Sequence, residues 1–274
     1  MHSIHGRAPA IATGLATARQ DLSVWVVTGD GDALSIGGNH LIHAMRRNVN
    51  LKILLFNNRI YGLTKGQYSP TSEFGKITKS SPFGSVDRPF NPVSLALGAE
   101  ATFVARTLDT DRKHLTSVLR AAAEHRGTAL VEIYQNCPIF NDGAYELLKD
   151  REEAEARIVH LNDGEPVRVG ADKLVARGDT GHLKVVDAEG ADMSRVVIHD
   201  AGADDPSSAF QLSRLDDPTM AHIPMGIFRN VTRPTYEDLV HAQIDDVVSA
   251  AGGGASDADL ETLLQGSDTW IVAG

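Results

Sequence analysis

A glycine–aspartate–glycine triplet and a pair of asparagines carry the clearest chemistry in this sequence. The triplet Gly29-Asp30-Gly31 follows a short apolar run, and the pair Asn57-Asn58 follows a second one. Carboxylate and amide oxygens are hard ligands that suit Mg²⁺, which often keeps phosphate oxygens among its remaining ligands. The glycines permit a tight turn and a close backbone approach to a bound molecule. Together, the two motifs predict a site for a Mg²⁺-bound diphosphate.

The spacing of the two motifs supports this interpretation. Twenty-five residues, 32–56, lie between them, which is enough for one crossover helix. Such a crossover places both motifs at the same edge of two neighbouring parallel strands. We expect the helix to start at about Ala33, so that its free N–H groups and positive dipole end face an anion. Ligands of open α/β sheets bind beyond the carboxyl ends of the strands, which is where the motifs would lie.

Other glycine-rich sites fit the triplet less well. A dinucleotide-binding fingerprint needs a third glycine where this chain has Leu34. An EF-hand that starts at Asp30 needs a glutamate where the chain has Leu41. No Gly-Lys-Ser/Thr sequence follows Gly29 to complete a P-loop. A turn and a strand end with no ligand remain the structural alternative, which the pairing of the two motifs at strand ends disfavours.

The elements around the motifs predict an α/β fold: an open, mostly parallel sheet with helices on both faces. We expect strands over residues 23–29, 51–58, 101–107 and 128–134. We expect helices over residues 6–18, 33–47, 92–97 and 112–126. Residues 61–91 are rich in Gly, Pro, Ser and Thr and lack periodicity, so they predict a long loop, of the kind that is usually functional or disordered.

Charge divides the 274-residue chain into two regions. Residues 1–140 carry 15 basic and 10 acidic side chains, and residues 141–274 carry 11 basic and 26 acidic ones. We therefore expect a cofactor-binding domain over 1–145 and an irregular α+β acidic extension over 146–274 that contacts a partner or closes over the site. Within the extension we expect short strands at 182–186 and 195–199 and a helix over 236–251, before the glycines at 252–254.

Composition excludes several classes of protein. The net charge of −10 disfavours nucleic acid as a partner, because phosphate contact needs basic surface. No apolar run approaches the roughly 20 residues of a membrane helix, and the N-terminus lacks the apolar core of a secretory signal. Cys137 is the only cysteine, which excludes an intrachain disulfide. These features predict a cytoplasmic protein in a reducing compartment, without a membrane partner.

The motifs and the residues after them resemble a known family. A Gly-Asp-Gly triplet followed at this distance by two asparagines is similar to the thiamine-diphosphate signature. With the stretch YGLTKGQYSPT at 61–71, the sequence resembles the β subunit of 2-oxoacid:ferredoxin oxidoreductases, most of all the 2-oxoglutarate type. The likeness is strong to about residue 145. It implies oxidative decarboxylation of a 2-oxoacid, with coenzyme A as acyl acceptor and ferredoxin as electron acceptor.

The resemblance also implies roles for individual residues. Mg²⁺ would be held by Asp30, Asn58 and the main-chain carbonyl of Ile60. The residues implied at the cofactor are Gly29, Asp30, Gly31, Asp32, Asn58, Ile60, Gly62 and Leu63. His5 corresponds to a family histidine near thiamine diphosphate, and Lys65 to a lysine that faces the 2-oxoacid carboxylate, which makes these two the candidate catalytic residues.

The sequence also departs from the family pattern. Cys137 corresponds to one ligand of a 4Fe–4S cluster, which needs four thiolates. We expect the other three in a segment ahead of the position where this chain begins. The resemblance further implies an α subunit, which supplies the glutamate that activates the cofactor. Two alternatives remain: a truncated, non-catalytic form of this subunit, or a non-oxidative thiamine-diphosphate enzyme such as an acetohydroxyacid synthase or a decarboxylase.

Overall fold

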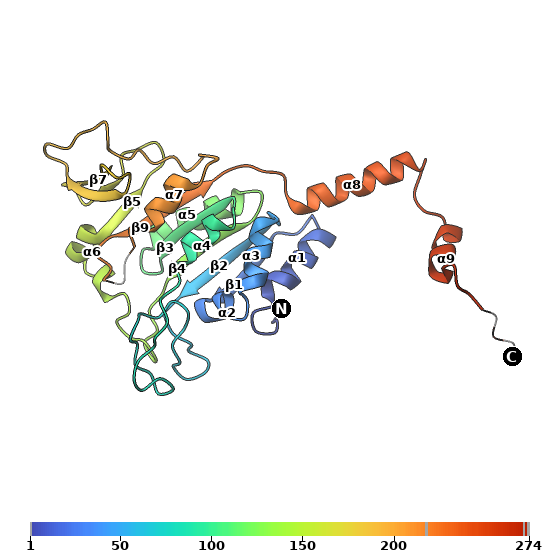
Figure 1. Ribbon diagram of the computed structural model, residues 1–274, viewed down its shortest axis with the longest axis horizontal. Helices are drawn as coiled ribbons and strands as arrows, with labels where there is room; N and C mark the ends of the chain where they lie inside the picture. Colours follow the sequence, from blue (N-terminus) through green and yellow to red (C-terminus); the bar gives the residue numbers. More distant parts are fainter. Residues whose placement is uncertain (1, 217–218, 271, 273–274) are drawn as a thin grey trace.

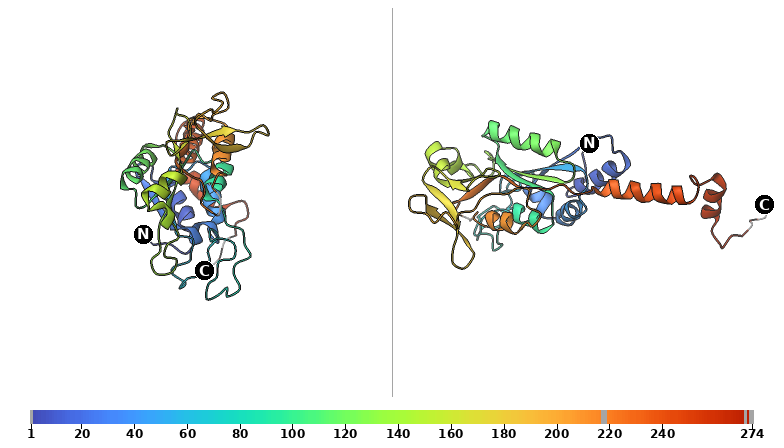
Figure 2. Two further views of the ribbon diagram at one scale, coloured as in Figure 1. Left: turned by 90° about the vertical axis from the view of Figure 1, so that its left-hand side faces the viewer. Right: turned by 90° about the horizontal axis from the view of Figure 1, so that it is seen from above.

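The computed structural model describes residues 2–216, 219–270 and 272. In these residues a single sheet runs through the body of the molecule with helices on both faces (Figures 1 and 2), and its strand order is β1-β2-β4-β3-β9-β5-β6-β7-β8. The strands are β1 (Val24–Gly29), β2 (Leu51–Asn57), β3 (Phe103–Leu108), β4 (Ala129–Tyr134), β5 (Ile158–Leu161), β6 (Arg168–Val169), β7 (Lys173–Arg177), β8 (Leu183–Asp187) and β9 (Ile223–Asn230). The helices are α1 (Ala8–Ala18), α2 (Asp30–Leu34), α3 (Gly38–Arg46), α4 (Pro92–Gly98), α5 (Arg112–Glu124), the 3₁₀ turn η1 (Glu146–Leu148), α6 (Arg151–Arg157), α7 (Ser207–Ser213), α8 (Tyr236–Ala250) and α9 (Asp257–Gln265).

The first four strands pair in parallel, so the predicted α/β class is confirmed. β1 pairs with β2, β2 with β4, and β4 with β3. β3 and β4 are buried along their whole length, because helices cover both of their faces. Their near-continuous apolar sequences are therefore the consequence of two-sided burial.

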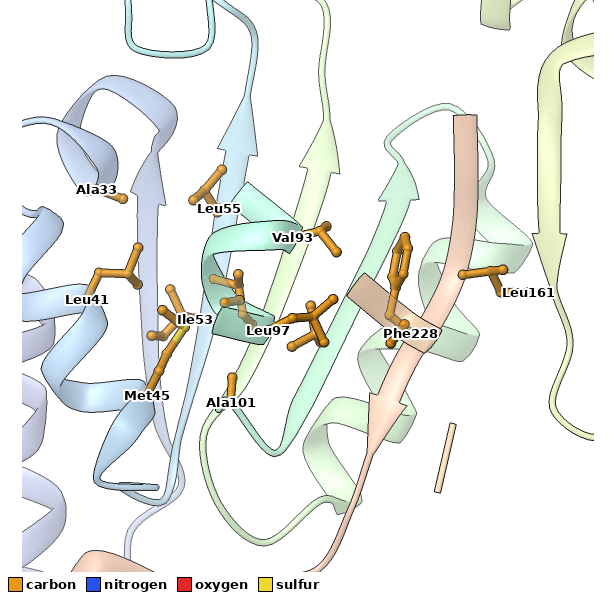
Figure 3. Close-up of a cluster of buried hydrophobic side chains, with 14 of the residues drawn as sticks. Ala33, Leu41, Met45, Ile53, Leu55, Val93, Leu97, Ala101, Leu161 and Phe228 are labelled. Atoms are coloured by element: carbon orange, nitrogen blue, oxygen red, sulfur yellow. The ribbon is translucent and has the colours of Figure 1, made fainter. Parts of the chain in front are cut away.

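The core lies between this sheet and its helices. On one face, Leu41 and Met45 of α3 and Leu97 of α4 pack against Ile53 of β2 (Figure 3). On the other face, Val118 and Ala122 of α5 pack against Phe103, Ala105, Val131 and Ile133 of β3 and β4. The two layers hold the strand ends in fixed positions, on which any site at the sheet edge depends.

The helix predicted over residues 33–47 is wrong as a single element. The structure has two helices instead, with α2 starting at Asp30 and α3 starting at Gly38. The break has a steric cause: a Cβ atom on Gly37 would lie 2.5 Å from the carbonyl oxygen of Asp32 and 3.1 Å from Cα of Gly6. The N-terminal segment therefore packs into the gap between α2 and α3. The other three predicted helices of the first region are confirmed as α1, α4 and α5.

The C-terminal region extends the sheet. β9 pairs antiparallel with β3 and parallel with β5, and β5 to β8 form an antiparallel continuation. The predicted strand at 182–186 is confirmed as β8, whereas 195–199 forms only isolated bridges, at Val196 and Ile198. The predicted helix at 236–251 is confirmed as α8. Since one sheet runs through both regions, the division between 1–145 and 146–274 stays a prediction.

Residues 61–91, called the site loop below, form neither helix nor strand, as predicted. Isolated bridges join Tyr61 to Gln67 and Thr78 to Ser81. In Figure 1 the loop lies beyond the strand ends of β2 and β4. None of the helices in the described residues is long and apolar enough to cross a membrane.

Phe228 tests how firmly β9 joins the C-terminal region to the core. Its side chain is fully buried in the main cluster. We expect Phe228→Ala to lower the free energy of unfolding by about 3–5 kcal/mol, because it leaves a cavity that the surrounding strands cannot close. Urea denaturation measures the loss. The matched control is Phe83→Ala, since Phe83 is 100% exposed and its loss costs under about 0.5 kcal/mol. Equal effects of the two changes would contradict the packing.

Candidate cofactor-binding site

The structure brings the two sequence motifs together at one edge of the sheet. Gly29, the last residue of β1, lies opposite Phe56 of β2, so Asp30, which follows β1, and Asn57, which ends β2, lie at neighbouring strand ends. This proximity confirms the prediction from the 25-residue spacing. The first turn of α2 contains the carboxylates of Asp30 and Asp32. The motif therefore presents negative side chains at the strand end, which suits a cation.

Asp30 is buried, with 2% of its surface exposed, and its carboxylate is surrounded by hydrogen-bond donors. Oδ2 accepts hydrogen bonds from the hydroxyls of Ser69 at 2.5 Å and Thr71 at 2.6 Å. The backbone N–H of Asn58 also donates to the carboxylate. Burial raises the pKa of the Asp30 carboxyl above its ordinary value, and the bonds from Ser69 and Thr71 partly oppose this rise. A nearby cation would favour the ionised form further.

A buried polar network continues from Asp30 into the sheet. The Thr71 hydroxyl also lies 2.8 Å from Oδ1 of Asn57, and Nδ2 of Asn57 donates to Oε1 of Glu132 at 2.7 Å. Oε2 of Glu132 accepts from Nε of Arg106 at 2.7 Å, and both side chains are fully buried. Arg106 also forms an ion pair with Asp216 at 3.1 Å. Asn57 is therefore held from both ends of its amide.

Sequence reasoning missed this network. Arg106 and Glu132 lie in the middle of the apolar runs that predict β3 and β4. A charged residue inside such a run has to be paired if the strand is covered on both faces. Opposite charges inside two apolar runs that form neighbouring strands are therefore the signal from which the pair of Arg106 and Glu132 could have been predicted.

Asn58 provides the test of whether a metal ion fits this site. Its side-chain Oδ1 is buried and has no hydrogen-bond partner, whereas its main-chain carbonyl accepts a bond from Asn141 at 2.9 Å. A buried oxygen without a donor costs free energy unless something satisfies it. An oxygen-binding cation beside Asp30 would do so, and the donor set suits Mg²⁺. Among the described residues, no three His, Cys, Asp or Glu side chains gather into another metal site.

Tyr61 holds the start of the site loop against the glycine triplet. Its hydroxyl donates to the carbonyl of Gly31 at 2.6 Å. A Cβ atom on Gly31 would lie 2.4 Å from the Tyr61 ring, so only glycine leaves room for this contact. The structure therefore places Gly31 next to the loop that carries Gly62, Leu63 and Lys65.

Asp32 and His5, which the sequence resemblance places near the cofactor, contact each other in the structure. Nδ1 of His5 is 2.5 Å from Oδ1 of Asp32, which also accepts the N–H of Gly6 at 2.7 Å. The other oxygen of Asp32 accepts the hydroxyl of Thr28 at 2.7 Å. These bonds direct the carboxylate of Asp32 toward the N-terminal segment and fix His5 at the rim of the site.

The other predicted residues lie on the site loop. Ile60 is buried, Gly62 is half-buried, and Leu63 is 97% exposed. Lys65 is exposed and has a left-handed backbone with φ of 70°, in a tight turn closed by its N–H bond to the Gly62 carbonyl at 3.0 Å. Only Ile60 is therefore built into the protein, whereas Leu63 and Lys65 are free to meet a ligand or a partner.

Comparisons with known proteins place these observations in a family. Residues 1–133 match the model of the thiamine pyrophosphate enzyme C-terminal TPP-binding domain. The chain is 62% identical over 273 residues to the 2-oxoglutarate oxidoreductase subunit KorB of Mycobacterium tuberculosis, covering 99% of this chain and 72% of that one. The chain belongs to the KorB family of 2-oxoacid:ferredoxin oxidoreductase β subunits. The family expected from the sequence motifs is thereby confirmed.

Two further comparisons agree with membership of the KorB family. The 2-oxoglutarate synthase subunit KorB of Archaeoglobus fulgidus is 42% identical over 176 residues, which cover 63% of this chain and 66% of that one. The solved 2-oxoglutarate:ferredoxin oxidoreductase of Magnetococcus marinus, with 2-oxoglutarate, coenzyme A and succinyl-CoA bound, matches with a TM-score of 0.71 and 31% identity. That match covers 96% of this chain and 75% of the other.

A cavity of about 320 Å³ adjoins the site of this KorB-family subunit. Asn57 and Thr71 of the polar network lie in its wall, together with Glu132. Arg59, Arg88 and Arg214 also line it, as do the carboxylates of Glu73, Glu132 and Asp216. Glu73 is paired with Lys76, and Glu132 and Asp216 are paired with Arg106, so the three arginines are the lining cations outside these ion pairs.

Cys137 lies close to the paired asparagines. It is half-buried and free, and its carbonyl accepts the N–H of Asn141 at 2.9 Å. Since Asn141 also donates to the carbonyl of Asn58, the turn that contains Cys137 packs on the end of β2. A group bound at Cys137 would therefore lie on the same side of the sheet as the candidate metal ligands.

The buried pair predicts a large cost for removing one of its partners. Arg106→Met leaves the carboxylate of Glu132 buried without a cation, so we expect the free energy of unfolding to fall by about 3–5 kcal/mol. Urea denaturation measures the loss, and Arg120→Met on the exposed face of α5 is the matched control. Adding Glu132→Leu removes the orphaned charge, so the double variant should recover part of the loss. A loss below about 1 kcal/mol for Arg106→Met would contradict this account.

Proposed function

We propose that this chain is the thiamine-diphosphate-binding subunit of a cytoplasmic enzyme that oxidatively decarboxylates 2-oxoglutarate. In this proposal coenzyme A accepts the acyl group and ferredoxin accepts the electrons. The observation that carries the proposal is the convergence of Asp30 and Asn58, whose buried Oδ1 atom lacks a partner, in a chain of the KorB family. The substrate is inferred from the names of the relatives, which act on 2-oxoglutarate.

The proposed metal site uses three oxygens of this chain. Asp30 and Asn58 would bind Mg²⁺ through their side chains, and Ile60 through its carbonyl. The surrounding backbone of Gly29, Gly31 and Gly62 would approach the diphosphate, together with Asp32 and Leu63. When bound, thiamine diphosphate supplies the electron sink for loss of CO₂. Ser69 and Thr71 hold the Asp30 carboxylate in position before any ligand arrives.

The proposed roles of His5 and Lys65 follow from their positions. Lys65 is an exposed cation on the loop that begins at the candidate metal ligands, where it can pair with a carboxylate of the substrate. His5 is held by Asp32 at the rim of the site, where it can donate a hydrogen bond to a bound ligand. In this proposal Lys65 binds and orients the substrate, and His5 orients the bound ligand.

The proposal requires other components. An α subunit would supply the glutamate that activates the cofactor, as the resemblance to the family implies. Cys137 would be one ligand of a 4Fe–4S cluster whose other thiolates lie outside this chain, since such clusters need four. When bound, such a cluster would supply one-electron transfer toward ferredoxin.

Asp30 provides the direct test of the cofactor site. We expect Asp30→Ala, in the complex with its α subunit, to weaken Mg²⁺-dependent thiamine diphosphate binding by more than about 100-fold. Removing a residue that only contacts a metal ligand typically weakens metal binding by about 10–100-fold, and loss of a ligand itself should cost more. Calorimetry measures the affinity with and without Mg²⁺. Asp21→Ala is the matched control, because Asp21 is exposed and paired only with Arg19. Unchanged binding by the Asp30 variant would refute the site.

Lys65 tests the proposed substrate class. Loss of a charge-assisted bond to the distal carboxylate should lower kcat/KM for 2-oxoglutarate by roughly 10–100-fold in Lys65→Ala. The value for pyruvate, which lacks this carboxylate, should change far less. Steady-state kinetics of the full complex give both numbers, and Lys113→Ala on the exposed face of α5 is the control. If the ratio of kcat/KM for 2-oxoglutarate to kcat/KM for pyruvate is the same in the variant and the wild type, Lys65 does not select the dicarboxylate.

A further inference from the structure

Three arginines from separate parts of the chain meet in the cavity beside the polar network. Arg59 follows β2, Arg88 lies near the end of the site loop, and Arg214 follows α7. Among the residues that the structure describes, none of the three guanidinium groups forms an ion pair or a hydrogen bond. We call this space of about 320 Å³ the arginine cavity.

Arg59 is the most constrained of the three arginines. Its side chain is half-buried, and its guanidinium lies over the ring of Tyr145, 4.9 Å from the centroid. Its backbone is left-handed, with φ of 56°, which is uncommon for a residue other than glycine. A charge withdrawn from water costs free energy unless an opposite charge or hydrogen bonds compensate for it. Arg59 is therefore held where an anion would stabilise it.

The arginine cavity is distinct from the candidate cofactor site. None of the residues proposed to hold Mg²⁺ or to approach the diphosphate lies in its wall. Thr71 does line it, and the Thr71 hydroxyl lies 2.6 Å from the carboxylate of Asp30 and 2.8 Å from Oδ1 of Asn57. The cavity is therefore a neighbour of the metal site, from which Thr71 and Asn57 separate it.

The charges at the arginine cavity leave a positive surplus. The carboxylates in its wall are Glu73, which pairs with Lys76, and Glu132 and Asp216, which pair with Arg106. When these partners are counted with the three arginines of the wall, the described residues carry five cations and three carboxylates there. A phosphate group carries a charge of about −1.5 to −2 at pH 7. The charge of one phosphate would therefore balance the surplus of two.

The arrangement of the donors also favours phosphate over carboxylate. A guanidinium presents its N–H groups as a planar fork, which binds either anion well. A carboxylate has two oxygens in one plane, whereas a phosphate group offers three strong acceptor oxygens that point apart. Since the three guanidinium groups come from three separate segments, a phosphate can accept hydrogen bonds from all of them.

The rest of the wall has room and apolar surface for a small organic group. Pockets for small molecules start at about 300 Å³, so the cavity is larger than a bare phosphate needs. Phe74 and Phe90 line it and are both exposed. A ligand whose organic part lies against these rings would remove them from water, which is favourable.

We propose that the arginine cavity binds a phosphate group, with Arg59, Arg88 and Arg214 as its donors. The group belongs either to free inorganic phosphate or to a small organic phosphate that packs on Phe74 and Phe90. Neither Mg²⁺ nor thiamine diphosphate takes part in this contact, so phosphate binding does not rest on the proposed function.

Calorimetric titration of the full chain with inorganic phosphate tests the site. The buffer contains EDTA and no Mg²⁺, so that phosphate is not recruited by a metal ion. We expect one phosphate per chain and saturation at millimolar concentration or below. Each of Arg59→Met, Arg88→Met and Arg214→Met should raise the Kd at least about 10-fold, because each loses a charge-assisted hydrogen bond. Arg120→Met, at an exposed position on α5, is the control and should bind phosphate like the wild type.

Two of the variants keep the test decisive if the third one folds poorly. Arg59 is half-buried, whereas Arg88 and Arg214 are exposed, so their substitution leaves the packing intact. Arg214→Lys retains the charge but loses the planar fork. Its Kd for phosphate should therefore lie between those of the wild type and Arg214→Met.

Two further ligands identify the chemistry of the site. Adenosine 5′-monophosphate that binds more tightly than phosphate, with the gain lost in Phe90→Ala, identifies an organic phosphate as the ligand. Equal or weaker binding of this nucleotide identifies inorganic phosphate. Succinate carries carboxylates only and should bind at least about 10-fold more weakly than phosphate, because it lacks the third oxygen on each group. Equal affinities for succinate and phosphate would overturn the assignment to phosphate.

Three other outcomes would overturn the proposal. Neither phosphate nor the nucleotide could saturate the chain, or all three arginine variants could bind phosphate like the wild type. Thiamine diphosphate with Mg²⁺ could also displace the phosphate, which would place it in the cofactor site. A chain that binds phosphate through the arginines and fails to bind thiamine diphosphate would contradict the proposed function and support the arginine cavity.

Discussion

The hydrogen bonds from Ser69 and Thr71 to the buried Asp30 carboxylate link three separate parts of the chain. They join the end of β1 to the site loop, and through Asn57 they reach the pair formed by Glu132 and Arg106. A carboxylate withdrawn from water requires such donors. These hydrogen bonds therefore couple three features of the structure: the position of the loop, the orientation of the Asn57 amide and the pairing of the central strands.

Local patterns in the sequence were sufficient for the parallel half of the fold. Strands covered on both faces have continuous apolar sequences, and a crossover of known length fixes which ends lie together. Asp30 and Asn58 could therefore be placed close together from the spacing of the two motifs. The polar network behind them could not, because the partners of Arg106 depend on which strand lies next to β3 and on where the chain passes at Asp216.

The errors have similar causes in long-range contacts. The break between α2 and α3 arises because Gly6, distant in the sequence, packs against Gly37. β9 was not predicted, because Pro224 and Gly226 are residues that usually argue against a strand. Its pairing depends on the edge of β3, which lies far away in the sequence. No helix was predicted at α9, beyond the glycines at 252–254, although Ser256 and Asp259 signal its start.

The site loop is anchored at its base and free in its middle. Ser69, Thr71 and Ser72 are buried at the metal-site end, and Ser85 is held by backbone bonds with Gly75 and Lys76, whereas Phe83 points into solvent. Insertions or replacements in the outer part would leave these anchors in place, because the added chain extends outward. The fold thus separates an anchored part of the loop, which lies next to the candidate metal ligands, from an exposed outer part. Changes in the outer part would alter what the loop contacts and leave Asp30 and Asn58 in place.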